Sequence, residues 1–113
     1  MRPHKQILLY CSNEFQAAEL RLVIETRISA RVTVATGLGV VTAVHSHDFH
    51  CAVLMHGDVE VIGFLRRKEI PTLEIGCAPS YADRVVSGEH MMDVLEALRL
   101  MCARKRGPKK VAA

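Results

Sequence analysis

The sequence predicts a single α/β domain, over residues 1–103, in which helices cover both faces of an open and mostly parallel sheet. The chain has 113 residues and half of them are apolar, which is enough for one hydrophobic core and too little for two domains. Short apolar runs alternate with amphipathic segments, as they do in strand–helix repeats. The run "CAVLM" at 51–55 lacks any polar residue, and such strands are typical of parallel sheets buried on both faces.

The first half of the chain is expected to contain two strand–helix units. The apolar run at 7–10 predicts a strand, and Ser12 or Asn13 can cap a helix over 14–27. The β-branched segment 31–37 predicts a second strand, and residues 38–45 predict a second helix, which carries three valines at 40, 41 and 44. The first helix is expected to bury Phe15, Ala18, Leu22 and Ile28 and to expose Glu19, Arg21 and Glu25.

The second half continues the alternation. Residues 49–55 predict a third strand and residues 58–69 a third helix, with Asp58 as its N-cap. Residues 70–77 predict a fourth strand. Pro71 lies at its start, where a missing N–H is tolerable. Residues 83–86 predict either a fifth strand at the sheet edge or an irregular segment. The inward residues are expected to be Val59, Ile62 and Leu65 in the third helix, and Met92, Leu95, Leu98, Leu100 and Met101 in a last helix over 89–104.

Three segments carry a resemblance to a known family: "KQILLYCSNEFQAAELRLVIE", "FHCAVLMHGDVEVIGFLRRKEIPTLEIGCA" and "ADRVVSGEHMMDVLEALRLM". In order and spacing they resemble the receiver domain of two-component response regulators, over about residues 5–103. The resemblance implies the CheY-like, flavodoxin-like fold, a three-layer α/β/α sandwich with about five strands. It also implies a stand-alone cytoplasmic module of a bacterial phosphorelay.

The residues that carry receiver chemistry are replaced at every key position. The resemblance implies an acidic pair for Mg²⁺, a phospho-accepting aspartate, a hydroxyl residue and a lysine, because a hard dication needs carboxylate oxygens and a phosphoryl group needs that cation and an ammonium. The matching positions hold Cys11 and Ser12, Met55, Gly76, and Gly88 (or Ser87 if the alignment shifts by one), and the aromatic switch position holds Val85. The sequence therefore predicts a pseudo-receiver, not an enzyme, which cannot accept phosphate at the usual site.

The helix that receivers place between strands four and five is predicted to be missing or very short. Only about five residues separate Cys77 from Asp83, whereas a parallel crossover normally takes about a dozen or more. We expect its loss to expose apolar sheet surface near Leu73, Ile75 and Val85, and such a surface usually marks an interface. The predicted partner is a protein of a signalling pathway or a second copy of the chain.

Soft side chains at the carboxyl ends of the strands give an alternative function. If strand one lies beside strand three, and strand three beside strand four, then Cys11, Cys77 and either Met55 or His56 meet in one crevice. Thiolate, thioether and imidazole suit copper(I) or zinc. The alternative to a pseudo-receiver is therefore a soft-metal or small-ligand sensor, with Cys11, His56 and Cys77 as ligands, and no other cofactor is predicted.

Three further histidines lie before the third strand or at its start, and they are expected to be structural. His45 and His47 fall at the end of the second helix, where a partly charged imidazole suits the helix dipole. With His50 they lie roughly 15–20 Å from His56, at about 3.3 Å per residue of strand. The histidines on both sides of this strand therefore cannot bind one ion.

Composition and charge exclude several other classes. No run approaches the about 20 apolar residues that cross a bilayer, and the N-terminus lacks a secretory signal, so we expect a cytoplasmic protein whose four cysteines are thiols. The net charge of +3 comes mostly from "RKRGPKK" at 104–110, so the body is nearly neutral and is not predicted to bind nucleic acid. The basic tail at 104–113 is expected to be disordered, with at most weak, salt-sensitive binding of nucleic acid or an acidic partner.

Overall fold

The computed structural model describes residues 5–55, 59–76, 82–87 and 91–103. These ranges contain five strands and four helices. In chain order they are β1 (Lys5–Tyr10), α1 (Glu14–Arg27), β2 (Ala30–Ala35), α2 (Leu38–Ser46), β3 (Cys51–Met55), α3 (Val59–Arg67), β4 (Thr72–Ile75), β5 (Arg84–Val86) and α4 (Met91–Ala103). The alternative left open for residues 83–86 is thereby decided, because β5 is a regular strand. No helix in the described ranges is long and apolar enough to cross a membrane.

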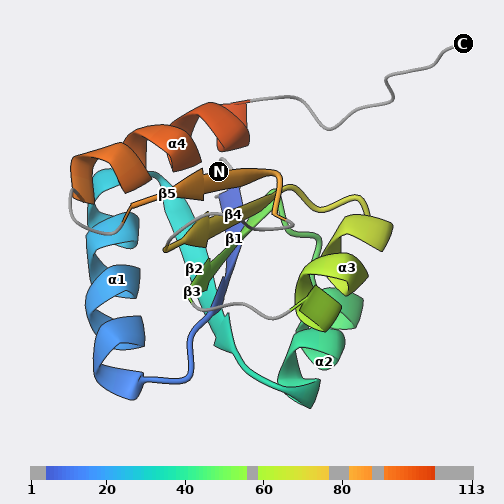
Figure 1. Cartoon of the computed structure of the whole chain (residues 1–113). Coiled ribbons are helices and arrows are strands. Elements are labelled where there is room, and N and C mark those ends of the chain that lie inside the picture. Colours follow the sequence, from blue (N-terminus) through green and yellow to red (C-terminus); the bar gives the residue numbers. More distant parts are fainter. Residues whose placement is uncertain (1–4, 56–58, 77–81, 88–90, 104–113) are drawn as a thin grey trace, which may run out of the picture.

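All five strands are parallel and follow the order β2-β1-β3-β4-β5 (Figure 1). Leu9 of β1 lies beside Val53 of β3, which in turn lies beside Leu73 of β4. The chain leaves β1 toward one edge of the sheet and returns to its other side at β3, so the topological switch point lies between β1 and β3. The flavodoxin-like fold, the strand order and the edge position of strand five are confirmed.

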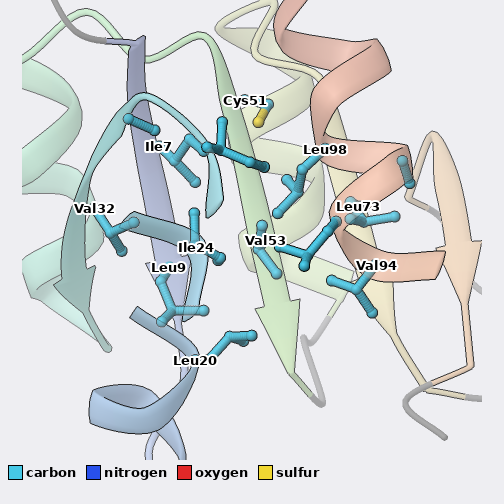
Figure 2. Close-up of a cluster of buried hydrophobic side chains, with 14 of the residues drawn as sticks. Ile7, Leu9, Leu20, Ile24, Val32, Cys51, Val53, Leu73, Val94 and Leu98 are labelled. Atoms are coloured by element: carbon cyan, nitrogen blue, oxygen red, sulfur yellow. The ribbon is translucent and has the colours of Figure 1, made fainter. Parts of the chain in front are cut away.

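Helices cover both faces of the sheet: α1 and α4 lie on one face, and α2 and α3 on the other (Figure 1). Because side chains alternate along a strand, neighbouring residues of β3 enter different cores. Val53 packs in the core under α1 and α4, whereas Leu54 packs in the core under α2 and α3. Figure 2 shows the first of these cores, where Ile24 of α1 and Leu98 of α4 meet the strand residues. The expected burial of strand three on both faces is confirmed.

The buried face of α1 differs from the predicted one. Ala17, Leu20 and Ile24 point into the core, in line with the buried Ile28, which was expected inside. The predicted residues Phe15, Ala18 and Leu22 are exposed. Both sets have helical spacing, so periodicity alone could not choose between them. The inward set continues beyond the helix into Ile28, whose N–H donates to the Ile24 carbonyl (2.8 Å).

Glu25 of α1 was predicted to be outside, and it is half-buried against the edge of the sheet. Its Oε2 accepts a hydrogen bond from the Val32 N–H (2.8 Å) and lies 3.4 Å from Nε of Arg21. β2 is an edge strand, and an edge strand leaves outward N–H groups without a strand partner. Glu25 therefore satisfies one of them and ties α1 to the edge.

The other helices bury most of their predicted faces and expose their first residues. Ile62 and Leu65 of α3 are buried as expected, but Val59 is exposed. In α4, Leu95, Leu98 and Met101 are buried as expected, together with Val94, Ala97 and Cys102, whereas Met92 and Leu100 are exposed. Val40 of α2 is buried, Val44 is half-buried and Val41 is exposed. The predicted N-cap Asp58 lies outside the described residues.

The connection from β4 to β5 spans only residues 76–83, and no helix occurs in its described part. Asp83, at its end, is held against the start of β4. Its Oδ2 accepts hydrogen bonds from the Thr72 N–H (2.8 Å) and the Thr72 hydroxyl (3.0 Å), and the Asp83 N–H donates to the same hydroxyl oxygen (2.9 Å). Arg66 of α3 adds an ion pair to Asp83 (3.4 Å). These contacts hold the start of β5 beside the start of β4.

The expected exposure of Leu73 and Ile75 is wrong, because both are buried under α4. Right-handed crossovers that step in the same direction across a parallel sheet place their helices on the same face. The steps from β3 to β4 and from β4 to β5 have the same direction, so a helix between β4 and β5 would lie on the face that α3 covers. Alternation puts Glu74 and its neighbour Val85 on that face, and Leu73 on the other. Glu74 and Val85 are both half-buried. On the face where that helix would lie, the described residues of β4 and β5 therefore form a strip of mixed polarity, not an apolar patch.

Candidate functional site

The exit of β1 carries a buried thiol where the resemblance implies an acidic residue. Cys11 belongs to the core under α1, and its Sγ donates a hydrogen bond to the Asn13 carbonyl (3.4 Å). Asn13 caps α1, because its Oδ1 accepts from the Gln16 N–H (3.0 Å). Ser12 is exposed beside them. The turn after β1 is thus built from packing and capping contacts.

Met55 and Gly76, the described residues at the exits of β3 and β4, carry no charged group either. Met55 is half-buried and packs against the core under α1 and α4. It lies beside Ile75 in the sheet, and Gly76 follows. The Gly76 N–H donates to the Val86 carbonyl (3.0 Å), so this residue continues the pairing with β5. A thioether and a glycine can neither accept a phosphoryl group nor bind a hard cation.

The remaining predicted pocket and metal residues lie largely outside the described ranges. Gly88, the position matched to the lysine, lies there, and so do His56 and Cys77 of the predicted metal set. Ser87, the other position considered for the lysine, is described and exposed. Within the described residues, no three side chains of His, Cys, Asp or Glu gather as metal ligands would. The soft-metal site stays a prediction.

The histidines before β3 have separate local roles, as predicted for structural residues. His50 Nδ1 accepts a hydrogen bond from the Gln6 N–H (3.1 Å), and the His50 N–H donates to the Gln6 carbonyl (2.8 Å). The His47 ring lies 5.7 Å from the ring of the buried Phe49. His45 is exposed in the last turn of α2. His50 therefore extends the contact between β1 and β3 beyond the sheet ladder.

A hollow of about 520 Å³ lies at the amino end of β4 and β5, and a second of about 670 Å³ lies along β2. The second is lined by Cys11 and Ser12 after β1, and otherwise mainly by β2 and α2. It lies on the β2 side of β1, whereas the switch point lies on the β3 side. Met55 and Gly76 are not among its lining residues. This hollow is therefore not the crevice that the sequence predicted.

A set of exposed apolar residues lies at the carboxyl end of the sheet, and sequence reasoning missed it. Of the nine large apolar residues that are exposed in the described chain, five stand at the first or second position of a helix: Phe15, Leu38, Val59, Met91 and Met92. Each helix follows a strand of a parallel sheet, so all four helices begin at this one end. Apolar residues directly after the helix caps were the available signal. We call these five residues the apolar rim.

The comparisons with known proteins bear on the fold. No family model matches the sequence, and no curated protein matches it. Among solved structures, the chain is similar to HP1043, an orphan response regulator of H. pylori, with a TM-score of 0.65 and 13% sequence identity over 90% of this chain and 99% of that chain. Likeness at this identity concerns the fold alone. The chain has a receiver-like, CheY-like fold, as the spacing of its strands and helices predicted.

Proposed function

We propose that this chain is a non-phosphorylatable pseudo-receiver, a cytoplasmic signalling module that acts through protein contacts and not as an enzyme. One observation carries the proposal: the carboxyl ends of β1, β3 and β4 hold a buried thiol, a half-buried thioether and a glycine. Phosphoryl transfer by a receiver needs carboxylates for the metal and an acceptor oxygen. A receiver-like scaffold without these groups keeps its surfaces and loses its chemistry.

A phosphate-mimic titration tests the loss of chemistry. Beryllofluoride with Mg²⁺ is expected to cause no saturable shift in the amide NMR signals of residues 11–13, 55 and 76, because no carboxylate is available to bind either species at these positions. A phosphorylatable receiver titrated under the same conditions is the positive control. Saturable shifts centred on these residues would overturn the proposal.

The apolar rim is the surface that we propose for the protein contact. Phe15 is 89% exposed and Leu38 is 86% exposed, and exposed apolar groups that gather at one end of a protein mark interaction sites more often than scattered ones do. The rim residues begin helices at the same end of the sheet as the strand exits, where the usual acidic groups are absent. Burying a charged group against an apolar partner would oppose binding, because the charge would lose its hydration. No such charge stands at these positions. We take the occupant to be a second copy of the chain.

Sedimentation of two matched variants tests this contact. The Leu38→Ser variant, at the rim, is expected to weaken self-association at least about tenfold, since burying one leucine contributes about 1.5–3 kcal/mol. The Leu100→Ser variant is the control, because Leu100 is also exposed but lies near the opposite end of α4. A dimer that both variants weaken equally, or a wild-type chain that stays monomeric at high concentration, would contradict this assignment.

A further inference from the structure

Two thiols from distant parts of the chain meet on the α1/α4 face of the sheet. Cys51 is the first residue of β3 and Cys102 is the last but one of α4, and their Sγ atoms lie 3.7 Å apart. Both side chains are buried in the core that Figure 2 shows around Ile7 and Leu98. A disulfide bond is about 2.05 Å long, so the two sulfurs need to approach by only about 1.7 Å to form one.

The two sulfurs are chemically unequal. The hydrogen bond with Cys51 lowers the pKa of Cys102, and the positive charge of Lys5 acts in the same direction, although burial opposes both. The same hydrogen bond and burial raise the pKa of Cys51. When Cys102 ionises, Cys51 keeps its proton and can donate it to the Cys102 thiolate. Since the thiolate is the nucleophile in thiol oxidation, Cys102 is suited to react first and Cys51 to resolve the product.

We propose that Cys51 and Cys102 form a redox-responsive pair that hydrogen peroxide converts to an intramolecular disulfide. The Cys102 thiolate attacks one peroxide oxygen and becomes a sulfenic acid, and the released hydroxide takes up the proton that Cys102 lost, forming water. The Cys51 sulfur then attacks the sulfenic sulfur, and its proton leaves with the hydroxyl group as a second water. The two thiols lose two electrons, and one peroxide becomes two waters. Cys102 is only 3% exposed, so peroxide must reach it through local opening at the end of α4.

The disulfide would fasten the end of α4 to the start of β3. Helix ends open more readily than helix centres, and the bond would remove this freedom from the last turn of α4. It would also close a loop of about 50 residues, which is expected to raise the Tm by about 5–15 °C. The pair lies at the amino end of β3, away from Met55 at its exit, so this inference does not depend on the proposed function.

Peptide mapping of the full-length, reduced chain tests the proposal directly. Trypsin places the four cysteines in four different peptides, 6–21, 32–66, 69–84 and 100–104. After treatment with excess hydrogen peroxide and alkylation of the remaining thiols, the folded monomer is expected to lose two hydrogens and to yield peptide 32–66 linked to peptide 100–104. The same treatment in guanidinium chloride is the control, in which this selectivity should disappear. A different linked pair, cross-linked dimers, or no loss of hydrogens from the folded chain would overturn the proposal.

Three serine variants test the separate roles of the thiols. Cys51→Ser is expected to accumulate a sulfenic acid on Cys102, which dimedone traps, and Cys102→Ser is expected to slow oxidation of Cys51 at least about tenfold. Cys11→Ser is the matched control, since Cys11 is another buried thiol. This variant is expected to leave the rate of disulfide formation unchanged. Because the pKa of Cys102 is lowered, the wild-type rate should reach its plateau at a lower pH than the rate of an ordinary thiol. Equal rates in all three variants would contradict the assignment, and the wild-type peptide map decides alone if a variant does not fold.

Discussion

Replacing Leu20 by alanine is expected to lower the free energy of unfolding by about 2–5 kcal/mol, which is a large part of the stability of a domain of this size. Leu20 is 4% exposed and packs in the core between α1 and the sheet. Its truncation removes apolar contacts and leaves a cavity. Ile24 holds α1 in place on the same face, so the helix cannot readily move to close that cavity. Denaturant unfolding, followed by circular dichroism, measures the change.

Leu22→Ala is the matched control, because it makes the same chemical change two residues along the same helix. Leu22 is 66% exposed, so its truncation is expected to change stability by no more than about 0.5 kcal/mol. The two variants also separate the observed face of α1 from the face that spacing predicted. A larger loss for Leu22→Ala than for Leu20→Ala would mean that α1 is rotated and would contradict the observed packing.

Asp83→Ala is expected to destabilise the fold by about 2–4 kcal/mol and to loosen β5 before the rest of the sheet. The change removes the acceptor of both the N–H and the hydroxyl of Thr72, and Thr72 is fully buried. Buried polar groups without partners cost far more than the net gain of forming their hydrogen bonds. Hydrogen exchange should show the loss first at the Gly76 N–H, which is bonded to β5.

Asp83→Asn separates the hydrogen bonds from the ion pair. The amide oxygen can still accept from Thr72, while the charge that pairs with Arg66 is lost. That ion pair is partly exposed and is expected to contribute less than about 1 kcal/mol. The asparagine variant should therefore unfold close to the wild type. If the asparagine variant were as unstable as the alanine variant, the ion pair with Arg66, and not the hydrogen bonds with Thr72, would hold β5 in place.

The sequence determined the order of the elements and which residues stand at the ends of the strands. Apolar runs such as 51–55 are strands because the sheet buries both of their faces, and the short connection after β4 predicts that the crossover helix is missing or very short. Once the strands were placed, residue identity alone fixed what stands at their ends. A thioether at position 55 carries no acceptor oxygen in any conformation. These conclusions needed only local pattern and chemical type.

Tertiary structure decided which faces turn inward and which distant groups meet. The apolar sets at 15, 18, 22 and at 17, 20, 24 are both consistent with a helix, and only packing against the sheet chose between them. The face of the sheet on which Leu73 lies likewise follows from the register of β4 with β3, which puts its side chain under α4. Cys51 and Cys102 are far apart in the chain, and Thr72 begins β4 whereas Asp83 precedes β5. Both contacts therefore depend on how strands and helices pack together. Periodicity relates residues within one element, whereas distances between elements are set by the packing of the whole core.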